Sequence, residues 1–147
     1  MGMVRAHVDI SRGLDGEAVV LACFDLDEEH LAASAHAVAA AAAERYRMAA
    51  MSSDDVLALR ELTALTDELR DLALRPGLRT VVLRPARLTA YRAAVAYFVE
   101  SRDAADWLRE EDREPLALAR TLLEPLEELG ADALRAALTG TLEPRSC

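Results

Sequence analysis

Two long stretches of the chain repeat apolar residues at helical spacing. Between Ser53 and Ala73, leucine and alanine recur in steps of four and three, which places them on one side of a helix. The preceding run, Leu31 to Met51, is rich in alanine and has a similar stripe at positions 31, 35, 38, 42, 46 and 49. We therefore expect a pair of antiparallel helices, with the first ending near Met51 and the second capped by Ser52 or Ser53.

The N-terminal part follows a strand pattern instead. Met3–Ile10 alternates apolar and polar residues, and Glu17–Phe24 is almost wholly apolar, as in a strand covered on both faces. The turn formers of Ser11–Gly16 lie between them, which predicts a hairpin. Pairing Ile10 with Glu17 puts Val4, Ala6 and Val8 on a core face with Val19, Leu21 and Cys23, and leaves His7 on the other face.

The chain alternates between strand and helix again after the helical pair. Arg75-Pro76-Gly77 ends the second helix, and Leu78–Leu83 has the composition of a third strand. Pro85 opens another helix, because the first helical position needs no amide hydrogen. The inner side of this helix consists of Leu88, Tyr91, Val95, Phe98 and Val99.

The last third predicts two further helical pieces. Trp107 and Leu108 begin a short one that ends at Arg113. The longer piece beyond Pro115 has its apolar stripe at positions 119, 122, 126, 129, 133 and 137 and ends at Gly140. Because Pro125 and Gly130 interrupt it, we expect either a kinked helix or two collinear ones.

The element order is therefore ββααβαα, which predicts an α+β fold. A small three-stranded sheet, made of the N-terminal hairpin plus one later strand, packs against four to five helices, with the apolar second strand at the centre. The alternative is an all-α bundle with a short N-terminal appendage. The 147 residues suit a single domain, 1–147, with a loose tail at 141–147.

Charge narrows the range of partners. The net charge is −9 and the pI about 4.8, so phosphate backbones and anionic lipids are repelled, and we expect neither nucleic acid nor membrane as a partner. No stretch has the pattern of a signal peptide or a membrane span. We therefore expect a cytoplasmic protein, with Cys23 as a buried, reduced thiol and Cys147 on a mobile end.

Catalytic and metal-binding patterns are scarce. On the predicted helix, His30 and His36 are six residues apart and do not share a face, whereas Asp27 and His30 do. The repeated Glu-x-x-His motifs of dimetal sites are absent, so we expect no metal or other cofactor. In the predicted register, Cys23 and His7 point to opposite faces, which argues against a thiol nucleophile. An enzyme using an unidentified carboxylate as acid or base is the third hypothesis for the function.

Two groups of residues are candidates for binding. The amides at the strand-to-helix junction Arg84-Pro85 attract anions, so Arg79, Arg84 and Arg87 are candidates for holding a small anion or metabolite. The alternative is that these arginines pair with carboxylates of neighbouring helices.

The second group consists of apolar or aromatic side chains at positions where a partner can contact them. Leu57 and Tyr97 fall outside the inner stripes of their helices, and Trp107 lies in a highly charged segment. Large exposed aromatics are frequent interface anchors. The leading hypothesis is therefore a regulatory or protein–protein interaction module whose partner is another protein or a second copy of itself, as in a homodimer.

Overall fold

The computed structural model describes residues 5–12, 14–16, 18–47, 51–77 and 79–139. The elements are β1 (Arg5–Arg12), β2 (Ala18–Leu26), α1 (Glu28–Arg45), α2 (Ser53–Ala73), β3 (Arg79–Leu83), α3 (Pro85–Asp103) and α4 (Glu110–Thr139). The strands form one antiparallel sheet in the order β1-β2-β3. This confirms the α+β fold, with β2 at the centre and four helices, and the all-helical alternative is wrong. The predictions for Val4, Ala49, Leu78, Gly140, Cys147 and the tail 141–147 concern residues outside the described ranges.

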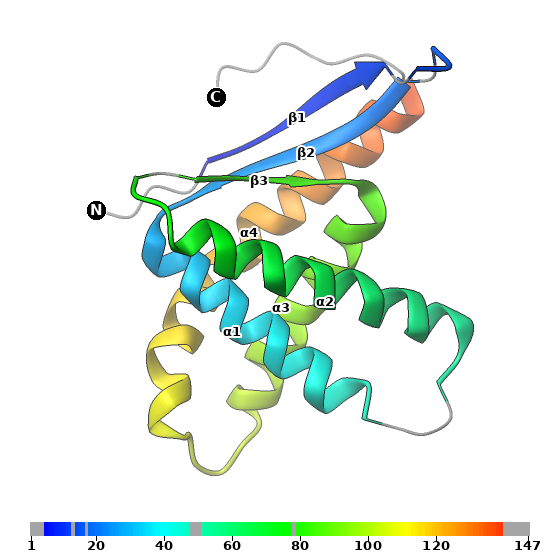
Figure 1. Cartoon of the computed structure of the whole chain (residues 1–147). Helices are drawn as coiled ribbons and strands as arrows, with labels where there is room; N and C mark the ends of the chain where they lie inside the picture. The colour runs from blue at the N-terminus through cyan, green and yellow to red at the C-terminus, as the bar shows by residue number, and fades with distance from the viewer. Residues whose placement is uncertain (1–4, 13, 17, 48–50, 78, 140–147) are drawn as a thin grey trace.

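The sheet lies along one side of the group of helices (Figure 1). On β3 the side chains alternate strictly, with Arg79, Val81 and Leu83 buried and the two residues between them exposed. On β2, Phe24 and Leu26 are fully buried against the helices. The helices therefore cover one face of the sheet, and the fold has two layers.

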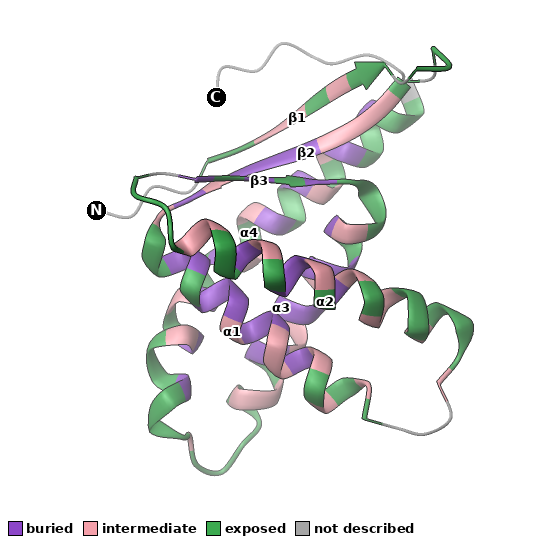
Figure 2. Ribbon diagram, in the orientation of Figure 1, coloured by how far each residue is buried: buried purple, intermediate pink, exposed green. Residues whose placement is uncertain are grey.

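Helices α1 and α3 form the centre of the helical layer, because each of them contacts the other three helices. The buried residues of α1 lie on several sides, and half of them are alanine, which allows the neighbouring helices to approach closely. Figure 2 shows buried positions along most of its length. Within α1, no residue after Ala41 is fully buried, and beyond it only partly buried side chains such as Ala42 and Tyr46 pack against the core. The helix ends at Arg45, and the prediction of an end near Met51 is wrong. Among the described residues, no helix combines the length and apolar character that crossing a bilayer requires.

The hairpin register differs from the predicted one by three residues. Ile10 pairs with Val20 and Val8 with Ala22, because β1 continues through Ser11 and Arg12 into the predicted turn. An odd shift exchanges the two faces of β2 relative to β1. Phe24 is fully buried on the core face, and Cys23 lies on the other face, directly opposite His7. The prediction that Cys23 and His7 point to opposite faces is therefore wrong.

The helix starts follow the local sequence chemistry. Ser52 caps α2 by accepting a hydrogen bond from the amide of Asp55, whose carboxylate accepts one from the amide of Ser52 in return. Asp27 caps α1 by accepting from the amide of His30. Pro85 takes the first position of α3, as predicted.

Helix α4 is a single helix of 30 residues that contains Pro115 and Pro125. The separate helical piece predicted from Trp107 to Arg113 is wrong, because 107 and 108 lie before the helix, which begins at Glu110 and continues through 113. Figure 1 shows α4 passing from the loop after α3 up to the sheet. Its buried side ends with Ala133 and Ala136, whereas Ala137, which the predicted stripe includes, is exposed.

Candidate functional site

The buried side of α3 ends at a charged residue, Arg102, and the buried side of α4 begins at one, Asp112. Arg102 follows Phe98 by four positions, and Asp112 precedes Leu116 by four, so each residue continues the apolar stripe of its helix. Only 13% of the Arg102 side chain and 6% of the Asp112 side chain are exposed. The two helices thus direct opposite charges into the same junction, where α1 lies beside them.

Four side chains form a connected polar group at this junction, which we call the Arg102 cluster: His36, Glu44, Arg102 and Asp112. Arg102 donates from both terminal nitrogens to Glu44, at 2.7 Å each, and its Nε lies 3.3 Å from Oδ2 of Asp112. The other oxygen of Asp112 accepts from Nε2 of His36 at 2.7 Å. The guanidinium also lies 4.6 Å above the ring of Phe98. The cluster therefore joins α1, α3 and α4.

The charges of the cluster stabilise one another. Hydrogen bonds from Arg102 lower the pKa of Glu44, and those to Glu44 raise the pKa of Arg102. Burial alone would raise the pKa of Asp112, but the hydrogen bond from His36 and the charge of Arg102 outweigh it, so this pKa lies below its usual value. Both carboxyl groups are therefore held ionised, in the form that accepts these hydrogen bonds.

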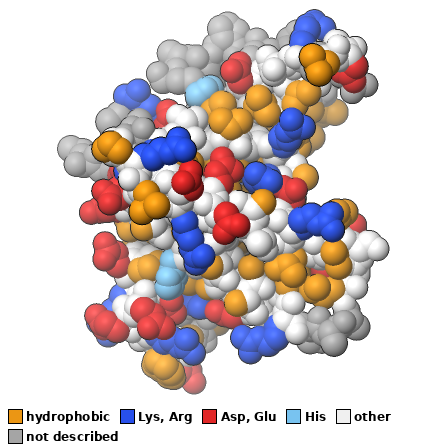
Figure 3. All heavy atoms as spheres, viewed as in Figure 1, with side chains coloured by type: hydrophobic (Ala, Val, Ile, Leu, Met, Phe, Trp, Pro, Cys, Tyr) orange, Lys and Arg blue, Asp and Glu red, His pale blue; other side chains and the backbone are white. Residues whose placement is uncertain are grey.

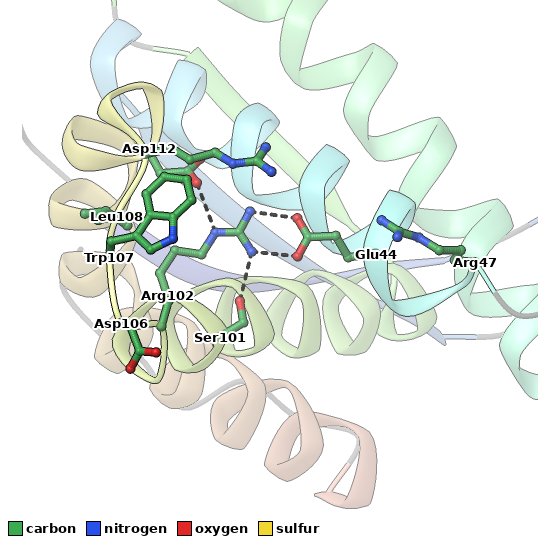
Figure 4. Close-up of a pocket in the computed structure, with 10 residues that line it drawn as sticks. Glu44, Arg47, Ser101, Arg102, Asp106, Trp107, Leu108 and Asp112 are labelled. Carbon is green, nitrogen blue, oxygen red and sulfur yellow. Dashed lines mark hydrogen bonds and ion pairs between the residues drawn. The ribbon is translucent and has the colours of Figure 1, made fainter.

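A pocket of about 440 Å³ opens beside the Arg102 cluster. Figure 4 shows Arg102 extending between Glu44 and Asp112, with Trp107 on the loop beside it and Asp106 pointing away from Arg102. The indole of Trp107 is 71% exposed, although the chain has few aromatic residues. The other residues lining the pocket are Arg47, Ser101, Ala105, Leu108 and Arg109.

The structure does not bring the three predicted anion-binding arginines together. Arg79 begins β3 and is buried on the helical side, whereas Arg84 is exposed at the cap of α3. Five extended residues of about 3.3 Å separate them by about 16 Å. Arg87 contacts Glu61 at 2.9 Å and Glu68 at 3.3 Å, which is the ion-pairing alternative. Anion binding at Arg84 stays a prediction, and Arg79 and Arg87 do not join Arg84 in one site.

The three candidate interface residues lie apart from one another. Leu57 is 56% exposed near the start of α2, and Trp107 borders the pocket. Tyr97 is only partly buried but packs against the core. Neither Leu57 nor Tyr97 lines the pocket of Trp107, so the three do not form one surface.

The side chain of His30 connects two helices and lines no pocket described above. Nδ1 of His30 lies 2.8 Å from Asp27, and Nε2 lies 3.1 Å from Thr121, which ties the start of α1 to α4. The sharing of a face by Asp27 and His30 is thus confirmed. Within the described ranges, no three His, Cys, Asp or Glu side chains form a group suited to a metal ion.

The second surface of interest is the face of the sheet that points away from the helices, which we call the open face. Its apolar part consists of Val19, Leu21, Cys23 and Val82, because these residues alternate with the buried ones. Val82 is 45% exposed, and Cys23, between His7 and Val82, is 8% exposed. With Cys23 beside His7, the register no longer argues against a thiol nucleophile, but little of the cysteine is accessible to a substrate.

Sequence reasoning missed the Arg102 cluster. The available signal was the spacing, since Arg102 and Asp112 each continue an apolar stripe into a charged segment. No comparable pattern marks Glu44, whose partner lies 58 residues away in the chain.

Comparison with known proteins adds no assignment to this geometry. No protein-family model matches the chain, and searches of curated proteins and of solved structures also found no match.

Proposed function

We propose that this chain is a protein–protein interaction module that associates with a second copy of itself through the open face of its sheet. The observation that carries the proposal is the composition of β2, which is apolar on both faces although the helices cover only one. Antiparallel sheets with a solvated face normally carry polar residues there. A second copy presenting the same face would remove this apolar surface from water.

The edges of the sheet favour association through the face and disfavour it through the strands. β1 carries Arg5, His7 and Asp9 on the open face, opposite Asp25, Cys23 and Leu21, and charges on an edge strand hinder pairing with another chain. β3 is short and begins with the buried Arg79, an inward-pointing charge of the kind that also protects edges. Both edges therefore disfavour strand pairing, and the proposed face-to-face contact uses the apolar part of the open face, with the β1 charges at its border.

The size of the open face sets the expected strength of association. It measures about 30 Å along β2 and about 14 Å across the three strands, so two copies bury about 800 Å² together. Stable specific interfaces bury about 1,200 Å² or more. The dimer is therefore expected to be weak and concentration-dependent, as suits a regulatory contact. A cytoplasmic location is part of the same proposal, since two cysteines provide no disulfide framework.

Sedimentation velocity over a range of protein concentrations tests the proposal. The wild-type chain should move from monomer towards dimer as its concentration rises, and Val82→Asp should remain monomeric, because a charge on the open face would be buried without a partner. Leu57→Asp is the matched control, an exposed apolar residue on α2, and should associate like the wild type.

Two results would contradict the proposal. A wild-type chain that stays monomeric at every concentration would remove self-association. Loss of association in Leu57→Asp but not in Val82→Asp would show that the interface lies on α2 and not on the open face.

A further inference from the structure

We propose that the pocket beside the Arg102 cluster binds a small anion that carries a planar ring. The site lies at the junction of α1, α3 and the loop before α4 and does not include the open face. Its volume of about 440 Å³ is within the range of small-molecule pockets. The chemistry of the ligand follows from the hydrogen-bonding groups that remain available there and from Trp107.

The acceptors on the pocket wall are already occupied. Both oxygens of Glu44 accept from Arg102, and the two oxygens of Asp112 accept from His36 and Arg102. The third acid of the pocket, Asp106, points away from Arg102 in Figure 4. A ligand donor that approaches Glu44 or Asp112 would therefore share an oxygen that already accepts one hydrogen bond.

Donors, in contrast, remain available on two arginines. Arg47 makes one long hydrogen bond of 3.5 Å, to the carbonyl of Ala43, and its charge also helps to lower the pKa of Glu44. Arg109 lies 3.7 Å from Glu111, with both side chains about two-thirds exposed, and such pairs are weak. Guanidinium groups bind carboxylate or phosphate oxygens by two parallel hydrogen bonds. In a protein of net charge −9, this donor-rich pocket favours an anionic head group.

The ring requirement comes from Trp107. Its exposed side chain lines the same pocket as the two arginines, and Figure 4 shows Arg102 and Glu44 between Trp107 and Arg47, so a ligand that contacts both must span the pocket. Planar rings such as nucleobases stack on exposed aromatic side chains. The wall behind the ligand is rigid, because Arg102 is held by Glu44, Asp112 and Ser101. A ligand with a planar ring and an acidic group could therefore stack its ring on Trp107 and place its acidic group against Arg47 and Arg109.

The experiment uses the fluorescence of Trp107, which is the single tryptophan of the chain and therefore reports on this pocket alone. Adenosine 5′-monophosphate and benzoate are the probes, and they distinguish a phosphate from a carboxylate head group. At least one of them should change the emission saturably, with adenosine and inorganic phosphate producing no saturable change at the same concentrations. Absence of saturation with both probes at about 5 mM, above the millimolar scale of weak binding, would overturn the proposal. Equal binding of adenosine or of inorganic phosphate would also overturn it, because one half of the recognition would then be unnecessary.

Substitutions locate the binding. Arg47→Gln and Arg109→Gln should each weaken the probe by about fivefold, the effect of losing one charged contact. Arg75→Gln, which removes an exposed arginine at the end of α2, is the matched control and should leave the affinity unchanged. If all three variants bind with the same affinity as the wild type, the probe does not contact these arginines and the assignment is wrong.

Discussion

Asp112 is a buried carboxylate whose surroundings favour its charged form. Its side chain is 6% exposed, and its two oxygens accept from residues of two other helices, His36 and Arg102. A carboxyl group whose pKa is lower in the folded than in the unfolded chain stabilises the fold above the unfolded pKa, near pH 4, and this contribution disappears as the pH falls through the folded pKa. Asp112 should thus contribute at neutral pH and lose its contribution in acid.

Asp112→Asn tests this contribution. The variant should lower the free energy of unfolding by about 1 to 3 kcal/mol at pH 7, because Arg102 loses one of its two acidic partners in a buried position. The difference from the wild type should shrink as the pH falls from about 5 to about 3. Urea unfolding at several pH values measures both effects. Asp103→Asn, which removes an exposed partner of Arg120, is the control and should change little. A difference for Asp112→Asn that does not depend on pH would contradict the account.

Gly130 is the second residue whose surroundings lead to a prediction. It lies within α4, where glycine is less favourable than alanine by about 0.8–1.0 kcal/mol. The atoms nearest to an added Cβ belong to the guanidinium of Arg92, which would have to move. It is the far end of a flexible side chain and has one long contact of 4.0 Å to the exposed Glu127.

Gly130→Ala should therefore raise the free energy of unfolding by about 0.5 kcal/mol, because the gain in helix propensity exceeds the cost of moving Arg92. Thermal unfolding followed by circular dichroism measures the change. A lower melting temperature would show that the position of Arg92 over Gly130 is fixed by the fold.

At the scale of elements, the alanines of α1 have different roles on its different sides. Ala37 has no exposed surface in the centre of the helical layer, whereas Ala32 is exposed. Ala37→Leu should destabilise the protein by about 1–3 kcal/mol, because the added side chain has no space between the packed helices. Ala32→Leu is the matched control, and its effect should stay within about 0.5 kcal/mol. Midpoints of denaturant unfolding give both values, and equal effects would contradict the central position of α1.

The elements themselves were predictable where one pattern dominates. The leucine stripe of α2 and the proline at the start of α3 fixed those helices, because each pattern has one structural solution. The hairpin register was not predictable, since β2 is apolar on both faces and Val19, Leu21 and Cys23 fit a core as well as Val20, Ala22 and Phe24 do. Packing of the largest side chain, Phe24, against Tyr91 of α3 decides the face, and this contact is not visible in the local pattern.

The candidate site was less predictable than the fold. The glutamate, the arginine and the aspartate of the cluster come from three helices, and only the packing of those helices brings the side chains within hydrogen-bond distance. Trp107 was recognisable as an unusual residue, but its pocket was not. The local sequence favoured Arg84 and Arg87 as ligand-binding residues. In the structure Arg84 is exposed, and Arg87 forms an ion pair with Glu61.

At the scale of the whole molecule, the surface combines a mixed charge pattern with a sheet face that none of the described helices covers. Figure 3 shows acidic and basic side chains interspersed on the side that it views, without a large block of one sign. Such a surface provides little long-range electrostatic steering. The proposed self-association depends on the apolar part of the open face, of which Val82 is the most exposed residue, and not on charge attraction.

The most direct test is an isotope-filtered nuclear Overhauser experiment on a concentrated equimolar mixture of labelled and unlabelled chains. Intermolecular signals should involve the methyl groups of Leu21 and Val82, because stacked sheets lie about 10 Å apart and their side chains interdigitate. Intermolecular signals confined to other residues, such as Leu57, or no intermolecular signals at all, would contradict association through the open face.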